Sequence, residues 1–184
     1  MRNEAISEVL DSDLVAKALA GDGSAFAHLV RRHGPIAKRM ARLWGAGADA
    51  DDVVQDAFVK AHAALPRFRS TSGFRPWLLS IVHNETRNLH RSRGRRAVRE
   101  SLAQLPDDLW ISDPQEEAMI TDLRRRLLTT IRQLPVELRE VVACRYLLEL
   151  SEIETAVTLK VPTGTVKSRL HRALNMLRTE VSHD

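Results

Sequence analysis

Residues 151–177 read SEIETAVTLKVPTGTVKSRLHRALNML, and this stretch decides the fold of the C-terminal half of the chain. Its first nine residues are typical of a short helix, Lys160 and Val161 form a tight turn, and Pro162 opens a longer helix that reaches about residue 181. Two helices joined by a turn of about three to four residues form a helix-turn-helix. The pattern predicts this motif here.

The longer helix separates apolar from polar side chains at about 100° per residue. One side carries the apolar set Val166, Leu170, Ala173, Leu174 and Leu177. The other side carries Thr165, Ser168, His171, Arg172 and Asn175, with Lys167 and Arg169 on the flanks and Thr163 and Gly164 at the start. The N-terminal half of such a helix enters a major groove, and small residues there allow the backbone to approach a phosphate. The alternative is an amphipathic helix of a bundle.

A second cationic region lies upstream, in a predicted helix from Pro76 to about Gly94 and the loop before it. Its buried stripe consists of Leu78, Ile81, Val82 and Leu89. A polar face carries Trp77, Ser80, Asn84, Arg87, Asn88 and Arg91, and the loop adds Arg67, Phe68, Arg69 and Phe74 around residues 70–73. Arginines hold phosphates, amides read base edges, and aromatic rings stack on unpaired bases, so this region suits single-stranded nucleic acid. The alternative for Trp77 and Phe74 is ordinary core.

The cleanest helical repeat covers residues 49–65, with Asp49 as the predicted N-cap and Pro66 as the stop. Its outer face carries Asp51, Asp52, Gln55, Asp56 and Val59. Asp52 and Asp56 are four residues apart and repel each other by a few tenths of a kcal/mol. An acidic face kept at that cost indicates either a basic partner surface or a solubilising surface.

The rest of the chain extends the all-α pattern, because no run alternates with the period of a strand. Helices are expected over 13–20 and 24–44, the second capped by Ser24 and open to a kink at Gly34-Pro35, and over 118–133 and 135–147. The predicted organisation is an N-terminal extension (1–11), a helical domain (12–96), an acidic, proline-containing flexible linker (97–117) and a second helical domain (118–184).

Charge is distributed in blocks along the 184 residues, although the net charge is only +4. Residues 61–106 carry +7 and 162–184 carry +2, whereas 1–60 carry −1 and 107–161 carry −4. Polyanion binding requires a local field of this kind rather than a large total charge. The alternative is an arginine-rich solvated face.

Several function classes are disfavoured by what the sequence lacks. It has one cysteine, Cys144, which argues against a disulfide framework and suggests a core residue rather than a redox sensor. No apolar run suits a membrane span, and the acidic N-terminus does not resemble a signal peptide, so a cytoplasmic protein without membrane insertion is expected. The seven histidines are scattered, and we expect no catalytic set, no metal site and no cofactor.

Four segments in this order resemble the extracytoplasmic-function (group 4) sigma factors of bacterial RNA polymerase. They are DADDVVQDAFVKAH (49–62), PRFRSTSGFRPWLLSIVHNETRNLHRSR (66–93), TIRQLPVELREVVACRYL (130–147) and VPTGTVKSRLHRAL (161–174). The resemblance extends from about Asp13 to Val181. It implies that residues 12–96 form sigma region 2, that 118–184 form the region 4 helix-turn-helix domain, and that the linker runs toward the polymerase active centre, with Trp110 and Ile111 packed along it or onto either domain.

The resemblance also implies partners for each surface. Asp52, Gln55 and Asp56 become candidate contacts to the clamp coiled coil of the largest polymerase subunit, and region 4 is expected to bind the flap. The −10 element of the promoter is expected to contact Arg67, Phe68, Phe74, Trp77, Asn84, Arg87, Asn88 and Arg91. The −35 element is expected to contact Thr163, Thr165, Lys167, Ser168, Arg169 and Arg172. A cognate anti-sigma factor is also expected, whereas the promoter sequence, the regulon and the inducing signal do not follow from the sequence.

The chain departs from the family pattern at two positions before the recognition helix. Thr155 stands where a bulky isoleucine is usual, and Lys160 stands where glycine usually makes the turn. A positive φ at Lys160 would cost about 1 kcal/mol. Two other classes stay open from the residues alone: an operator-binding regulator, which leaves the Trp77 region unexplained, and a helical adaptor, which leaves the cationic segments unexplained.

Overall fold

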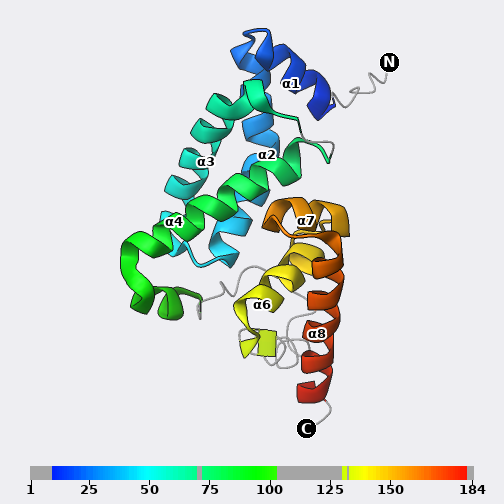
Figure 1. Ribbon diagram of the computed structural model, residues 1–184. Helices are drawn as coiled ribbons and strands as arrows, with labels where there is room; N and C mark the ends of the chain where they lie inside the picture. Colours follow the sequence, from blue (N-terminus) through cyan, green and yellow to red (C-terminus); the bar gives the residue numbers. More distant parts are fainter. Residues whose placement is uncertain (1–9, 70–71, 103–129, 132, 182–184) are drawn as a thin grey trace, which may run out of the picture.

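The computed structural model describes residues 10–69, 72–102, 130–131 and 133–181, and every element assigned within them is helical (Figure 1). The N-terminal helices are α1 (Asp11–Leu19), α2 (Gly23–Leu43), α3 (Ala50–Ala64) and α4 (Phe74–Leu102), with 3₁₀ turns η1 (Gly47–Asp49) and η2 (Leu65–Arg67). The C-terminal helices are α6 (Val136–Val142), a π-helical turn η5 (Ala143–Leu147), α7 (Glu152–Leu159) and α8 (Thr163–Val181). The all-α prediction is confirmed.

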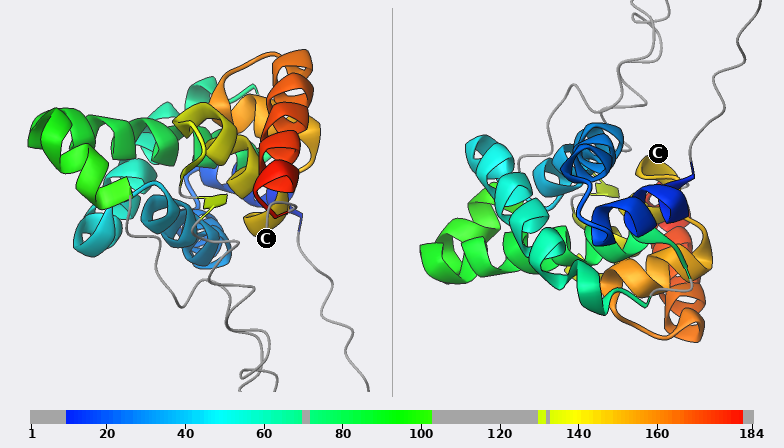
Figure 2. Two further views of the ribbon diagram at one scale, coloured as in Figure 1. Left: turned by 90° about the horizontal axis from the view of Figure 1, so that it is seen from below. Right: turned by 90° about the horizontal axis from the view of Figure 1, so that it is seen from above.

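The N-terminal helices pack around one apolar core. Leu29, Met40, Ala57 and Leu78 are fully buried, or nearly so, and they come from α2, α3 and α4. Burial at these positions follows the 3.6-residue repeat of each helix, which turns one apolar stripe inward. Helix α4 packs on α2 and α3, and it also packs against α7 of the C-terminal half (Figure 2).

Two details of α2 differ from the sequence prediction. The N-cap is Asp22 rather than Ser24, because the Asp22 carboxylate accepts hydrogen bonds from the backbone N–H groups of Ser24 and Ala25. The helix also continues through Pro35, which is exposed, without being divided. Proline removes one backbone hydrogen bond and crowds the carbonyl four residues earlier, but the buried stripe of this long helix keeps it continuous.

Helix α4 begins at Phe74, two residues before the predicted start; its first segment ends at Gly94, as predicted, and a second helical segment follows a kink and reaches Leu102. Gly94 interrupts it with φ 81° and ψ 158°, a conformation that glycine adopts without strain. The first residues of the predicted linker are therefore helical. The remainder of that linker, with Trp110 and Ile111, and most of the predicted 118–133 helix lie outside the described residues.

The helix-turn-helix forms as predicted. Ser151 and Glu154 make a capping box at the start of α7, in which each side chain accepts a hydrogen bond from the other residue's backbone N–H. Lys160 ends α7 in the left-handed region (φ 55°, ψ 46°), so the strained turn expected from the sequence is present. Val166 and Ala173 are fully buried and fix α8 against the domain core.

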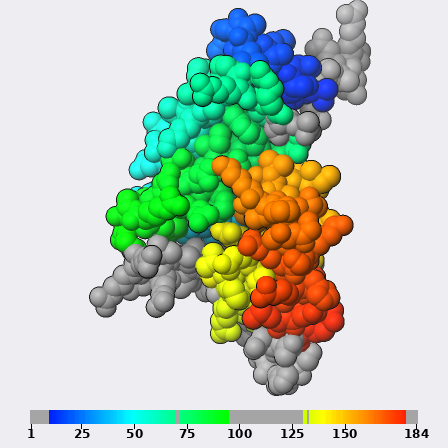
Figure 3. Space-filling model, in the orientation of Figure 1, coloured from blue at the N-terminus to red at the C-terminus, as the bar shows by residue number. Residues whose placement is uncertain are grey.

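The two helical domains lie against each other rather than apart. Helix α7 packs on α4, and the space-filling view shows this contact as a continuous surface (Figure 3). The linker prediction alone gave no reason to expect this pairing.

Candidate nucleic-acid interface

The polar face of α8 is open to solvent. Ser168, His171, Arg172 and Asn175 are exposed, and the side chain of Lys167 is 65% exposed although its Nζ lies 3.5 Å from Glu152 Oε2. Thr163, Thr165 and Arg169 are half-buried at the edges of this face. The apolar side is buried at Val166 and Ala173 but reaches solvent at Leu174, which is 37% exposed. Helix α8 therefore presents donors and a positive charge along its N-terminal half, as recognition of a DNA groove requires.

The polar face of α4 is only partly open. Arg87, Asn88 and Arg91 are exposed, and Arg91 Nη1 donates a hydrogen bond to Asn88 Oδ1 at 3.3 Å. Asn84 is half-buried. Ser80, which the helical pattern placed on this face, is buried instead and donates its hydroxyl to the Trp77 carbonyl at 2.7 Å. The angular pattern placed Ser80 on this face because it cannot take neighbouring segments into account.

An aromatic cluster supports the loop before α4. Trp77 is half-buried, with ring centroids 4.9 Å from Phe68 and 5.6 Å from Phe74. Phe74 is 1% exposed, so it is a core residue in this conformation, as the alternative interpretation held. Its buried ring packs against Phe68 and Trp77. Phe68 is half-buried and Arg67 is exposed, so these two side chains can meet a ligand directly.

A hollow of about 510 Å³ opens beside this cluster. The loop and the start of α4 contribute Phe68, Ser72, Phe74 and Arg75, and α1 and α2 contribute Asp11 and His33. Its volume and its aromatic and polar lining suit an unstacked nucleobase. Glu154 of the C-terminal domain also lines it. Arg75 and Glu154 were not among the sequence-predicted site residues; Arg75 stands within the predicted loop, but Glu154 is brought here only by domain packing.

His33 is one of the residues that line this hollow, and it is 5% exposed. Its Nε2 lies 2.7 Å from Asp11 Oδ2, and Asp11 Oδ1 accepts a hydrogen bond from Arg32 at 2.7 Å. Burial lowers the pKa of His33, and the charge of Asp11 opposes this only in part. The ring is therefore neutral near pH 7 and acts as a structural link between α1 and α2.

The acidic face of α3 is exposed as predicted at Asp52, Gln55 and Asp56. Asp51 forms an ion pair with Lys38 at 2.6 Å, and Asp49 pairs with Arg93 instead of capping the helix with its side chain. Among the residues that the structure describes, no ion pair involves Asp52 or Asp56. Their charge is available to a basic partner surface.

Other chemistry finds little support in the described ranges. Burial raises the pKa of the Cys144 thiol, which is fully buried, so the core interpretation of this residue is supported. No group of three histidine, cysteine or acidic side chains within the described ranges is arranged to hold a metal ion. None of the described helices is long and apolar enough to span a bilayer.

Comparison with known proteins matches two family models to this chain. Residues 29–96 match Sigma-70 region 2, and residues 124–177 match Sigma-70, region 4. The sigma-E factor of Escherichia coli strain K12, an ECF RNA polymerase sigma factor, is 32% identical over 95% of both chains. The sigma-E factor of Haemophilus influenzae is 30% identical over 95% of this chain and 96% of its own.

Two solved structures share the fold. CnrH, solved in complex with the cytosolic domain of CnrY, is 33% identical with a TM-score of 0.68 and covers 95% of this chain and 98% of its own. RpoE of Bartonella quintana, solved with the anti-sigma factor NepR, is 28% identical with a TM-score of 0.62 and covers 86% and 98%. With both sigma regions and nearly the whole length matched, the chain belongs to the extracytoplasmic-function sigma factors, which direct RNA polymerase to promoters.

Proposed function

We propose that α8 reads the −35 element of the promoter through Thr163, Thr165, Lys167, Ser168, Arg169 and Arg172. The observation that carries this proposal is the exposed N-terminal half of α8, held in place by the buried Val166 on the opposite side. Arginine forms bidentate hydrogen bonds to guanine, and threonine and serine bond to either bases or phosphates. Arg172 is the one exposed arginine within this set.

The −10 element is proposed to bind α4 and the loop before it. Arg67, Arg87, Asn88 and Arg91 are exposed and lie where a strand would pass. Trp77 and Phe68 supply aromatic surface next to the hollow, while Phe74 supports them from the core. Asn84, half-buried, would meet a base only at its exposed edge. Extruding a base costs a few kcal/mol, which contacts in the hollow would offset.

Core RNA polymerase is proposed to bind the acidic face of α3 at Asp52, Gln55 and Asp56 through the clamp coiled coil, and to bind region 4 through the flap. The proposed domain boundaries are 12–96 and 118–184. The chain is proposed to act in the cytoplasm as a binding factor that makes and breaks no covalent bond.

A cognate anti-sigma factor is proposed as a further partner of this chain. Its support is that similar proteins of the same family, CnrH and the Bartonella RpoE, were solved in complex with CnrY and the anti-sigma factor NepR. Copurification from cells before and after induction would identify such a partner.

Run-off transcription tests the proposed function directly. Core RNA polymerase is incubated with a pool of genomic fragments, with or without the purified chain, and the start sites are sequenced. We expect discrete start sites that share −35 and −10 sequences only when the chain is present. The same start sites with core enzyme alone, or none with the chain, would refute the proposal.

A further inference from the structure

The contact between the two domains lies next to the loop that is proposed to bind the −10 element. Arg75 Nη2 donates a hydrogen bond to the Leu148 carbonyl of the C-terminal domain at 2.6 Å. Thr158 Oγ1 of α7 lies 3.4 Å from the Pro76 carbonyl at the start of α4. Figure 1 shows α7 lying across the first turns of α4. The C-terminal domain is therefore seated at the end of α4 where the proposed strand path begins.

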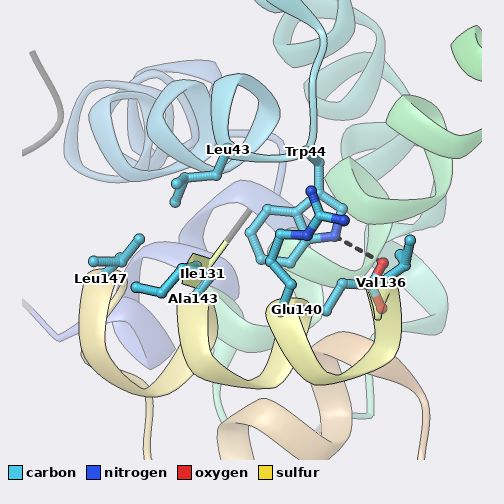
Figure 4. Close-up of a pocket in the computed structure, with 8 residues that line it drawn as sticks. Leu43, Trp44, Ile131, Val136, Glu140, Ala143 and Leu147 are labelled. Atoms are coloured by element: carbon cyan, nitrogen blue, oxygen red, sulfur yellow. Dashed lines mark hydrogen bonds between the residues drawn. The ribbon is translucent and has the colours of Figure 1, made fainter. Parts of the chain in front are cut away.

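A second contact holds the domains at the other end of the interface. Glu140 Oε1 of α6 accepts a hydrogen bond from Trp44 Nε1 at 3.1 Å (Figure 4). The same oxygen lies 3.0 Å from His83 Nε2. The side chains of His83 and Glu140 are only 4% and 17% exposed. Hydrogen bonds to a carboxylate are strong when water is largely excluded, and removing the acceptor leaves two buried donors unpaired. Glu140 is thus the central polar link between the domains.

Domain pairing also changes what the hollow offers to a ligand. Glu154, whose carboxylate also accepts a hydrogen bond from the Ser151 backbone, lines the hollow together with Phe68 and Arg75. A nucleic-acid phosphate approaching this side meets a like charge. The Arg75 guanidinium is already engaged by Leu148, and its Nε is buried without a hydrogen-bond partner. The Nη2 group that holds the Leu148 carbonyl is not free to hold a phosphate in this arrangement, although the guanidinium carries further N–H donors.

We propose that this domain pairing is an autoinhibitory contact within the sigma factor itself. In the closed form the C-terminal domain packs on Arg75 and Pro76, where the loop before α4 ends, and full binding of the melted strand requires the domains to separate. Arg75 then exchanges the Leu148 carbonyl for a phosphate of the strand. The inference rests on the proposed −10 function of α4, and it adds a closed state that needs no second protein.

A closed state lowers apparent affinity in proportion to its population. If about nine-tenths of the free chains are closed, full opening raises the affinity for a −10 strand about tenfold. A substitution that weakens the Glu140 contact between the domains, without changing the proposed −10 surface, should therefore raise the affinity for the −10 strand. Gain of function is diagnostic, because a substitution that merely damages the fold lowers binding.

The experiment compares Glu140→Ala with Glu137→Ala in the full chain. Both substitutions remove one acid from α6, but Glu137 is exposed and forms no ion pair within the described residues. Dyes on Ala63→Cys in α3 and Met176→Cys in α8 report domain separation by energy transfer. Both positions are exposed, whereas Cys144 is fully buried and will not be labelled.

The DNA probe is a fluorescent single strand that carries the −10 sequence found by run-off transcription. We expect Glu140→Ala to lower energy transfer and to raise affinity for this strand at least threefold, while Glu137→Ala matches the unmodified protein. Equal energy transfer in all three proteins, or opening without a gain in affinity, would overturn the autoinhibitory contact.

Arg75→Ala tests the exchange separately. It removes the Leu148 contact, so energy transfer should fall, but it also removes the proposed phosphate ligand, so affinity should not rise. A gain as large as that of Glu140→Ala would show that Arg75 is no strand ligand. Energy transfer is measured without DNA, so it tests the domain contact independently of the proposed function. If energy transfer falls in Glu140→Ala but run-off transcription fails, the proposed function is refuted and the contact between the domains is still supported.

Discussion

The two proposed DNA-binding surfaces of this sigma factor differ in their access to solvent. Helix α8 presents Ser168 and Arg172 to water along an uncovered face. The loop before α4 has comparable chemistry, yet Arg75 is occupied by Leu148 and the neighbouring hollow is lined in part by Glu154. Positive charge alone therefore does not determine which surface can bind DNA. The two surfaces differ in that the second domain packs beside only one of them.

The two surfaces are also supported in different ways. Small and aliphatic residues, Val166 and Ala173, seat α8 by simple apolar burial. The α4 surface instead depends on a ring cluster of Phe68, Phe74 and Trp77, in which the outer rings are half-buried. Half-buried rings can rearrange when a ligand binds. We therefore expect the side chains of the α4 surface to move on binding, whereas those of α8 already face solvent.

The largest effect is expected on the open surface. Arg172→Ala should weaken binding to a duplex −35 element by about 1–3 kcal/mol, roughly fivefold to 150-fold, because it removes an exposed guanidinium that is proposed to contact a base or phosphate. Footprinting of polymerase holoenzyme on a start site found by run-off transcription measures the loss.

Arg178→Ala is the matched control, since Arg178 is exposed on the same helix but lies beyond the proposed contact set. It should lower affinity less and without changing sequence preference. If Arg172→Ala leaves the upstream footprint intact, α8 does not recognise the −35 element. It would then no longer be one of the two DNA-binding surfaces compared above.

A somewhat smaller effect is expected at the third surface, the acidic face of α3. Asp56→Arg should lower the affinity for core polymerase about tenfold, because it replaces an attractive charge by a repulsive one at the proposed contact. Asp13→Arg carries the same charge change at an exposed position on α1 and should leave the affinity nearly unchanged. Titration of labelled chain with core enzyme compares them, and equal affinities would remove α3 from the interface.

Helical periodicity predicted most of what is local in this fold. The 49–65 helix, the short helix before Lys160 and the strained Lys160 turn are confirmed, because each depends on neighbours within a few residues. The N-cap at Asp22 was misassigned because Ser24 is also a good cap residue and lies two positions away.

The non-local features could not be predicted. Trp44 and Glu140 are 96 positions apart, and nothing in either segment indicates that they form a hydrogen bond. The domain pairing, the burial of Ser80 and the presence of Glu154 beside the hollow all belong to tertiary packing. The sequence-predicted contacts on α8 could be placed by helical periodicity because a single helix carries them, whereas the positions of those around Trp77 depend on several segments.

A stability test separates the helix core from the domain contact. Thr155 is fully buried in α7, and its hydroxyl has no hydrogen-bond partner within the described residues. Thr155→Val should therefore raise the free energy of unfolding by about 1 kcal/mol, because it removes an unsatisfied buried hydroxyl. Urea unfolding followed by circular dichroism measures this.

Thr158→Val is the same change three positions along α7, where the hydroxyl faces the Pro76 carbonyl. It should give no stabilisation, since a contact to the covered surface is lost. If both substitutions stabilise equally, the Thr158 hydroxyl contributes nothing to domain pairing, and the coverage of the −10 loop depends on Glu140 and Arg75 alone.

The last expected effect is a pH dependence of stability that arises beside the domain contact. Burial holds the pKa of His33 below its ordinary value of 6.5, so below that pH the unfolded chain takes up a proton that the folded chain does not. The free energy of unfolding should then fall as pH drops from 7 toward 5, by at most about 1.4 kcal/mol per pH unit from this group, and should be unaffected above pH 7.5. His33→Asn should flatten this slope, whereas His171→Asn, at an exposed position on α8, should leave it unchanged. Equal slopes in the unmodified protein and His33→Asn would mean that the acid sensitivity arises from another group. Titration of His33 would then not distinguish the α4 surface from the α8 surface, and the two would differ only in how they are packed.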